Sequence, residues 1–177
     1  PELLTNFKIY GNSLQETRSG KNLFNYAIVG ATGTKQNGGY YRSGEKSIRF
    51  NTYETLSNYI GKTVTLSFDI TVSETATFAI YQYQKNGIGI DFQTISKEIT
   101  ANIPTKIVIT GEVKELGTTA SYSKGELMVY NANYTGNYFV TNVQIEEGDT
   151  ATEYEPYGVS PSPDYPSEIS SVGDLVT

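Results

Sequence analysis

The sequence predicts an all-β protein, a jelly-roll β-sandwich of two antiparallel sheets with extended N- and C-terminal connectors. The first observation is composition: the 177 residues are rich in Thr, Ser and Asn and include fifteen Tyr, which favour strands over helices. The second is the alternation of apolar and polar residues in Lys62–Ser73, which is typical of a strand with one buried face. The third is that no long amphipathic helical pattern alternates with the strands, which argues against a parallel sheet.

Further segments with the same alternation follow one another at short spacing. In the last of them Phe139, Val143 and Ile145 are expected to share the inner face. A helical turn is predicted at Thr52–Tyr59, and Gly111 is expected to mark a β-bulge. The predicted strands are Asn22–Val29, Lys46–Tyr53, Lys62–Ser73, Thr75–Gln84, Asp91–Thr100, Pro104–Glu115, Glu126–Asn131 and Asn137–Glu147.

The two ends of the chain differ from its middle. Residues 1–20 are interpreted as an N-terminal connector and residues 21–148 as the jelly-roll domain. Residues 149–177 contain a run of prolines from Pro156 to Pro166, which favours an extended conformation with little core of its own. This last segment is therefore expected to be a linker or a strap laid over a sheet.

Composition also excludes several functions. Without Cys or His the chain has no thiol nucleophile, no Ser-His-Asp triad and none of the usual zinc ligands. A net charge of −6 with scattered Lys and Arg offers no basic stripe for nucleic acid, and the apolar runs are too short to cross a membrane. Glu146 and Glu147 are neighbours on a strand, so they point to opposite faces and cannot act as a glycosidase pair. The chain is therefore expected not to be an enzyme, not to bind nucleic acid and not to insert into a membrane.

Several motifs together resemble a known family. They are FKIYGNSLQET (7–17), SGKNLFN (19–25), VTLSFDI (64–70), VQIEEGDTATEYEPY (143–157) and SPSPDYPSEISSVGD (160–174). This combination resembles the carbohydrate-binding-module-like jelly-roll domains of tail and baseplate proteins from phages and prophages of Gram-positive bacteria, over nearly the whole chain.

The resemblance implies a function and a setting. The chain would be a non-catalytic module of a larger tail protein, placed on the virion tail outside the cell, that adheres to host cell-wall polysaccharide. Its partners would be that polysaccharide and neighbouring domains of the parent protein, which would also govern any oligomer. No cofactor is expected apart from a structural Ca²⁺ of the kind such modules carry, for which Glu16, Glu147 and Asp149 are candidates by location.

A sugar-binding surface needs flat rings for the C–H faces of a pyranose and amides, Arg or carboxylates for its hydroxyl groups. The polar positions of three predicted strands offer both, because residues two apart on a strand share a face. The missing Trp departs from the sugar platforms common in this fold. The predicted ligand-binding residues are Tyr81, Tyr83, Arg49, Asn51, Tyr53, Tyr138, Asn142 and Gln144.

Two other interpretations compete with this surface. The tyrosines would also suit cross-strand packing or an interface with other tail subunits, in which case the chain is a structural spacer or interaction domain without glycan affinity. The segment Thr32–Ser43, with Tyr40, Tyr41 and Arg42 after a Gly pair, could form an adaptable binding rim or an ordinary hairpin connection.

Overall fold

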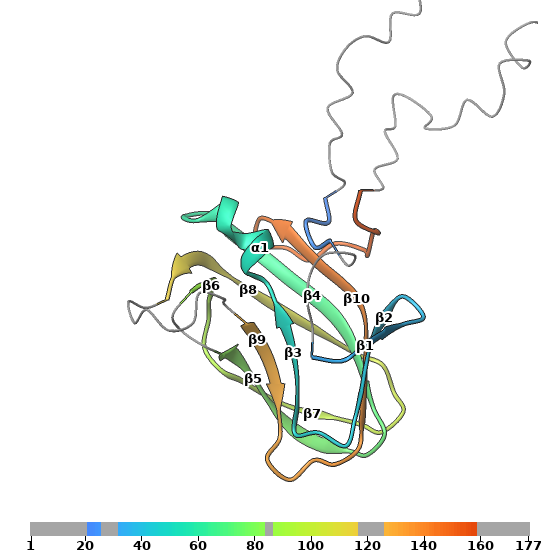
Figure 1. Cartoon of the computed structure of the whole chain (residues 1–177). Helices are drawn as coiled ribbons and strands as arrows, with labels where there is room; N and C mark the ends of the chain where they lie inside the picture. Colours follow the sequence, from blue (N-terminus) through green and yellow to red (C-terminus); the bar gives the residue numbers. More distant parts are fainter. Residues whose placement is uncertain (1–20, 26–31, 84–86, 117–125, 159–177) are drawn as a thin grey trace, which may run out of the picture.

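The computed structural model describes residues 21–25, 32–83, 87–116 and 126–158, whose strands form two antiparallel sheets packed as layers (Figure 1). The four-stranded sheet has the order β3-β9-β5-β7, with β3 (Ser47–Asn51), β9 (Glu126–Tyr130), β5 (Ala76–Tyr83) and β7 (Ile95–Ile99). The short helices α1 (Tyr53–Leu56) and η1 (Ser57–Tyr59) confirm the helical turn. The six-stranded sheet has the order β1-β2-β10-β4-β8-β6, with β1 (Thr34–Gln36), β2 (Gly39–Ser43), β10 (Asn137–Glu147), β4 (Thr63–Val72), β8 (Thr105–Glu115) and β6 (Ile88–Asp91).

The pairing of the strands confirms the predicted fold class. From β2 onwards successive strands alternate between the two sheets, so that the chain crosses from one layer to the other at every turn. The antiparallel pairs are nested: β5 pairs with β7, β4 with β8, β3 with β9 and β2 with β10. A long hairpin rolled up on itself gives this nesting, and that is the topology of a jelly roll.

The core lies between the sheets and is built by the alternation seen in the sequence. The inward positions of β4 are Val64, Leu66, Phe68, Ile70 and Val72, each at most 1 % exposed. They meet the inward residues of the four-stranded sheet, which come from β3, β5 and β9. The predicted inward residues of these strands, Ile48 and Phe50 on β3 and Phe78 and Ile80 on β5, are all buried.

Strand β10 departs from the predicted alternation. Its register against β4 shifts between Thr141 and Gln144, and Asn142 has a positive φ of 53°, so one extra residue sits in β10 as a β-bulge. The bulge reverses which side chains face the core: Tyr138 is buried before it, and Val143 and Ile145 are buried after it. The prediction that Phe139 shares their inner face is therefore wrong, since Phe139 lies on the outer side with only partial burial.

Three smaller expectations are also corrected or refined. The segment 91–100 is not one strand, because β6 ends at Asp91 in one sheet and β7 begins at Ile95 in the other. Gly111 is not a bulge: its register with Val64 is regular, and a Cβ at this position would lie 2.2 Å from the Asp91 carbonyl oxygen on β6. The segment 32–43 forms the hairpin β1–β2, turned at Asn37 and Gly38 with positive φ.

Candidate functional site

The outer side of the four-stranded sheet brings together predicted residues from strands that are not neighbours. β9 lies between β3 and β5, and its register with each aligns their outward residues across the sheet. Two cross-strand rows result, Arg49–Met128–Tyr81 and Asn51–Glu126–Tyr83. We call these six positions the β9 face. Four of the predicted ligand-binding residues are in it: Arg49, Asn51, Tyr81 and Tyr83.

An ion pair occupies the middle of the β9 face. Arg49 Nη1 lies 3.2 Å from Glu126 Oε2, with side chains 29 % and 21 % exposed. Beside this pair the Tyr81 hydroxyl donates to Met128 Sδ at 3.9 Å, and Met128 is only 7 % exposed although it faces outward. The face therefore offers partly buried polar groups next to an aromatic ring, and these are the two kinds of group that a sugar surface needs.

Glu126 and Met128 are functional candidates that the sequence reasoning missed. The sequence predicts a strand at Glu126–Asn131, but a segment this short between polar residues gives only a weak indication of which side faces outward. The available signal was the alternation itself: Leu127 and Val129 are apolar and buried, so Glu126 and Met128 must face the other way.

The remaining predicted residues do not join this face. Tyr138, Asn142 and Gln144 belong to β10 in the six-stranded sheet, so the expectation of one shared surface is wrong. Asn142 is exposed and donates from Nδ2 to Asp69 Oδ2 at 2.7 Å. Tyr53 lies in α1, after the end of β3, because the strand stops at Asn51.

Tyr138 was expected on the solvent side and is instead fully buried. Its ring packs edge-on against Tyr134, with ring centroids 4.8 Å apart, and against Phe78. Burial raises the pKa of Tyr138, so its hydroxyl stays protonated. That hydroxyl has no hydrogen-bond partner among the residues that the structure describes. Tyr138 is a core residue that cannot touch a ligand.

Tyr138→Phe tests this placement. Because it removes a buried hydroxyl without a partner, we expect the free energy of unfolding to stay the same or to rise by about 1 kcal/mol. The matched variant is Tyr134→Phe, since the Tyr134 hydroxyl donates to the Asn137 carbonyl oxygen at 2.8 Å and accepts from the Ser73 N–H at 3.1 Å. We expect that variant to lose about 1 to 2 kcal/mol in urea unfolding. A larger loss for Tyr138→Phe than for Tyr134→Phe would contradict the assignment.

Gln144 faces outward but is covered. Residues 149–155 cross the outer side of β10 as a strap, so Gln144 is buried beneath them. Its Oε1 accepts from the Glu155 N–H at 2.8 Å, and its Nε2 donates to Glu146 Oε2 at 2.7 Å. The Gln144 amide is hydrogen-bonded to other residues of the chain at both its oxygen and its nitrogen, so Gln144 is no longer a candidate ligand-binding residue.

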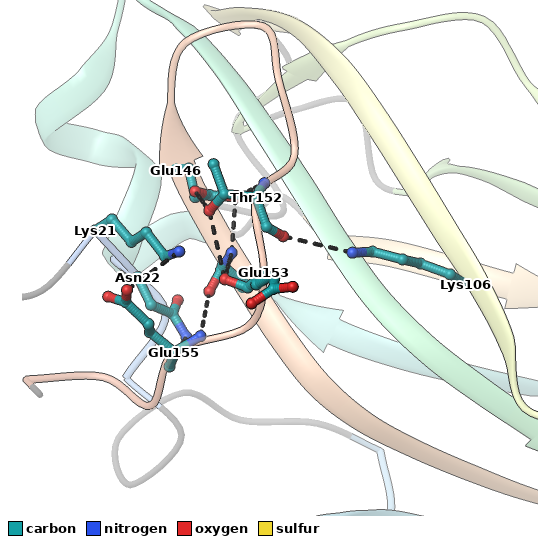
Figure 2. Close-up of polar contacts among 8 residues, drawn as sticks. Lys21, Asn22, Lys106, Glu146, Thr152, Glu153 and Glu155 are labelled. Atoms are coloured by element: carbon teal, nitrogen blue, oxygen red, sulfur yellow. Dashed lines mark hydrogen bonds and ion pairs between the residues drawn. The ribbon is translucent and has the colours of Figure 1, made fainter.

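Glu146 is the centre of the contacts between the strap and β10 (Figure 2). It is 4 % exposed, and its carboxylate accepts from the Thr152 hydroxyl at 2.5 Å and from the Thr152 N–H at 3.0 Å. Burial alone would raise the pKa of Glu146, but the hydrogen bonds from Thr152 and Gln144, with the nearby Lys21 charge, outweigh it and lower the pKa. The carboxylate is therefore held in its charged form as a structural acceptor.

Asn22 ties the beginning of the described chain to the same place. Its Nδ2 donates to the carbonyl oxygens of Val143 at 3.1 Å and Glu155 at 2.8 Å, and its Oδ1 accepts from the N–H groups of Phe24 at 2.9 Å and Ile145 at 3.2 Å. Lys21 adds an ion pair with Glu155 at 3.2 Å, and Figure 2 shows these side chains on one side of the strap with Lys106 on the other. The arrangement fastens both ends of the domain to β10.

The acidic residues considered for catalysis or metal binding have other partners. Glu146 is buried under the strap, whereas Glu147 is exposed and pairs with Lys62 at 3.5 Å. Asp149 Oδ1 accepts from the Thr150 hydroxyl, and Glu16 lies outside the described residues. In the part of the chain that the structure describes, no three acidic side chains come together as a metal-binding group. The described helices are also too short and too polar to cross a membrane.

The fold and the β9 face define a jelly-roll β-sandwich module with a polar and aromatic sheet surface. No family model matches the chain, and no curated protein matches it. Among solved structures, a CBM4 carbohydrate-binding module is similar at 15 % identity, with 68 % of this chain and 94 % of that chain covered and a TM-score of 0.44.

Two further solved structures are similar in the same way. One holds the CBM22-1–GH10 modules of the Clostridium thermocellum endo-1,4-β-D-xylanase 10B in complex with xylohexaose, at 12 % identity over 73 % of this chain and 26 % of that chain, with a TM-score of 0.43. The other is the N-terminal cellulose-binding domain of Cellulomonas fimi β-1,4-glucanase C, at 16 % identity over 70 % and 90 %, with a TM-score of 0.41.

Proposed function

We propose that the protein is a non-catalytic carbohydrate-binding module and that the β9 face is its glycan-binding surface. The observation that carries the proposal is the register of β9, which aligns Arg49 on β3 with Tyr81 on β5 across Met128. The Tyr81 ring, an amide, a guanidinium and a carboxylate thus meet on one side of a sheet. This side lies on the four-stranded sheet, whereas the strap crosses β10 in the other sheet.

The proposed setting is a tail or baseplate protein of a phage or prophage of a Gram-positive host, with host cell-wall polysaccharide as the ligand. The motifs at 143–157 and 160–174 support it through their resemblance to such proteins. Without Trp a single face would bind weakly, but a virion tail presents many copies. Linked weak sites give stable attachment, because the second contact forms at a high effective concentration.

Tyr81→Ala tests the face directly. Removing a stacking ring should weaken binding of purified wall polysaccharide about tenfold, or roughly 1.4 kcal/mol, as measured by isothermal titration calorimetry. Tyr154→Ala is the matched control, because Tyr154 is a 43 % exposed tyrosine on the strap and away from β9. Equal affinity in the two variants would remove the β9 face as the site. An absence of binding in the unchanged protein would remove the function.

The alternative function is a spacer or subunit-interaction domain without glycan affinity. One observation favours it: Asn22 and Glu155 are hydrogen-bonded, so the incoming and outgoing chain meet at one corner, as suits a domain inserted between other parts of a tail protein. Light scattering on the purified protein separates the two functions. The spacer function would be favoured if the unchanged protein formed an oligomer of defined size that bound no polysaccharide, and if Tyr81→Ala dissociated that oligomer.

A further inference from the structure

We infer that the β9 face takes an uncharged glycan and rejects wall polymers that carry phosphate. This inference rests on the proposed function and deepens it by naming the class of ligand. Its basis is the way in which the charges of the face are already paired within the protein.

The outward positions of the four-stranded sheet carry one cation and two carboxylates among the described residues. Arg49 is the cation, and Glu126 and Glu98 are the carboxylates, with Glu98 opposite Thr77 on the edge strand β7. Lys97, the other cation of these strands, is opposite the buried Phe78, so it belongs to the inner side of that edge. The outward positions of this sheet therefore carry a net negative charge, and the net charge of the whole chain is −6.

Arg49 is ion-paired with Glu126 within the protein. The ion pair at 3.2 Å joins two partly buried side chains, so water screens it less than a pair on the open surface. A phosphate group bound to the guanidinium would lie beside the Glu126 carboxylate, which would repel it as a like charge. Arginine binds phosphate most strongly through two N–H groups at once, and here Nη1 of Arg49 already bonds Glu126 while Nε is buried.

The same pair suits a hydroxylated ligand. A carboxylate only accepts hydrogen bonds and a guanidinium only donates them, whereas each sugar hydroxyl does both. Two neighbouring hydroxyl groups can therefore bridge Glu126 and Arg49 without separating them. The ring of Tyr81, in the same cross-strand row as Arg49, covers the adjoining C–H surface.

The test compares two probes on the full chain by calorimetry. One is a phosphate-free wall polysaccharide of neutral hexoses, and the other is poly(glycerol phosphate). We expect binding of the first only, with the dissociation constant changing less than about twofold between about 0.1 M and about 1 M salt, where the Debye length falls from about 10 Å to about 3 Å. Binding of poly(glycerol phosphate) that weakens strongly with salt would overturn the inference and leave the proposed function intact.

Glu126→Gln gives a gain-of-binding test. Because it releases Arg49 from its carboxylate, we expect this variant to acquire measurable, salt-sensitive affinity for poly(glycerol phosphate). Glu98→Gln is the matched control: it removes the same charge from the same sheet without touching Arg49, and it should acquire none. Equal behaviour of the two variants would overturn the inference. If the unchanged protein binds neither probe, the proposed function falls and the inference falls with it.

Discussion

Asn22→Ala should destabilise the protein by roughly 3 kcal/mol, because it leaves several backbone groups at the edge of β10 without partners. Asn22 is 1 % exposed, and its side chain bonds the carbonyl oxygens of Val143 and Glu155 and the N–H groups of Phe24 and Ile145. Alanine satisfies none of them. The expected fall in melting temperature is about 6 to 12 °C for a chain of this size.

Asn133→Ala is the control for this change. Asn133 is exposed in the turn before β10, and its backbone N–H, which the substitution keeps, bonds the Asn131 side chain. Its effect should stay within about 0.5 kcal/mol. Thermal unfolding followed by circular dichroism distinguishes the two variants. If Asn22→Ala had the same melting temperature as Asn133→Ala, the contacts around Asn22 would contribute little to the stability of the folded state.

Glu146→Gln should cost about 2 kcal/mol at neutral pH, since hydrogen bonds to a charged acceptor are the stronger kind. The amide nitrogen of the new residue would face donors from Thr152 or Gln144. The lowered pKa of Glu146 sets the pH dependence. A carboxyl group whose pKa is lowered by folding contributes its full stability above the ordinary value of 4.5, and that contribution is lost as the pH falls through the folded-state value.

The difference in unfolding free energy between the unchanged protein and Glu146→Gln should therefore shrink as the pH falls below 4.5. Glu153→Gln is the matched control, because Glu153 is exposed on the same strap and contributes its backbone carbonyl to the contacts with Gln144. Urea unfolding at a series of pH values measures both differences. A constant difference for Glu146→Gln across that range would contradict the role of its charge.

Much of the fold was predictable because most strands keep a strict alternation. In β4 every second residue from Val64 to Val72 is apolar and buried, and the same rule places Ile48 with Phe50 and Phe78 with Ile80. The polar positions of the same alternation face outward, and they include Arg49, Asn51 and Tyr81. Which strand lies between β3 and β5 was not predictable, because pairing depends on contacts between residues far apart in the chain.

Strand β10 shows why the rest could not be predicted. The residues of 137–147 fit a continuous alternation, yet the extra residue at the bulge turns Tyr138 inward and leaves Phe139 outside. Only the register against β4 reveals that residue. Gln144 escaped prediction for a different reason, since the strap that covers it has no periodicity and is positioned by Asn22, which lies 133 residues before Glu155.

The contact between Asn22 and Glu155 has a mechanical consequence. If a host surface pulls on the β9 face while the flanking chain is anchored, tension enters the domain at the corner where its two ends meet. The load then falls first on the hydrogen bonds of Asn22, Gln144 and Glu146 to the strap, and the sheets bear it only after those bonds open. The corner would act as the first point of yield under force, while the β9 face lies on the other sheet.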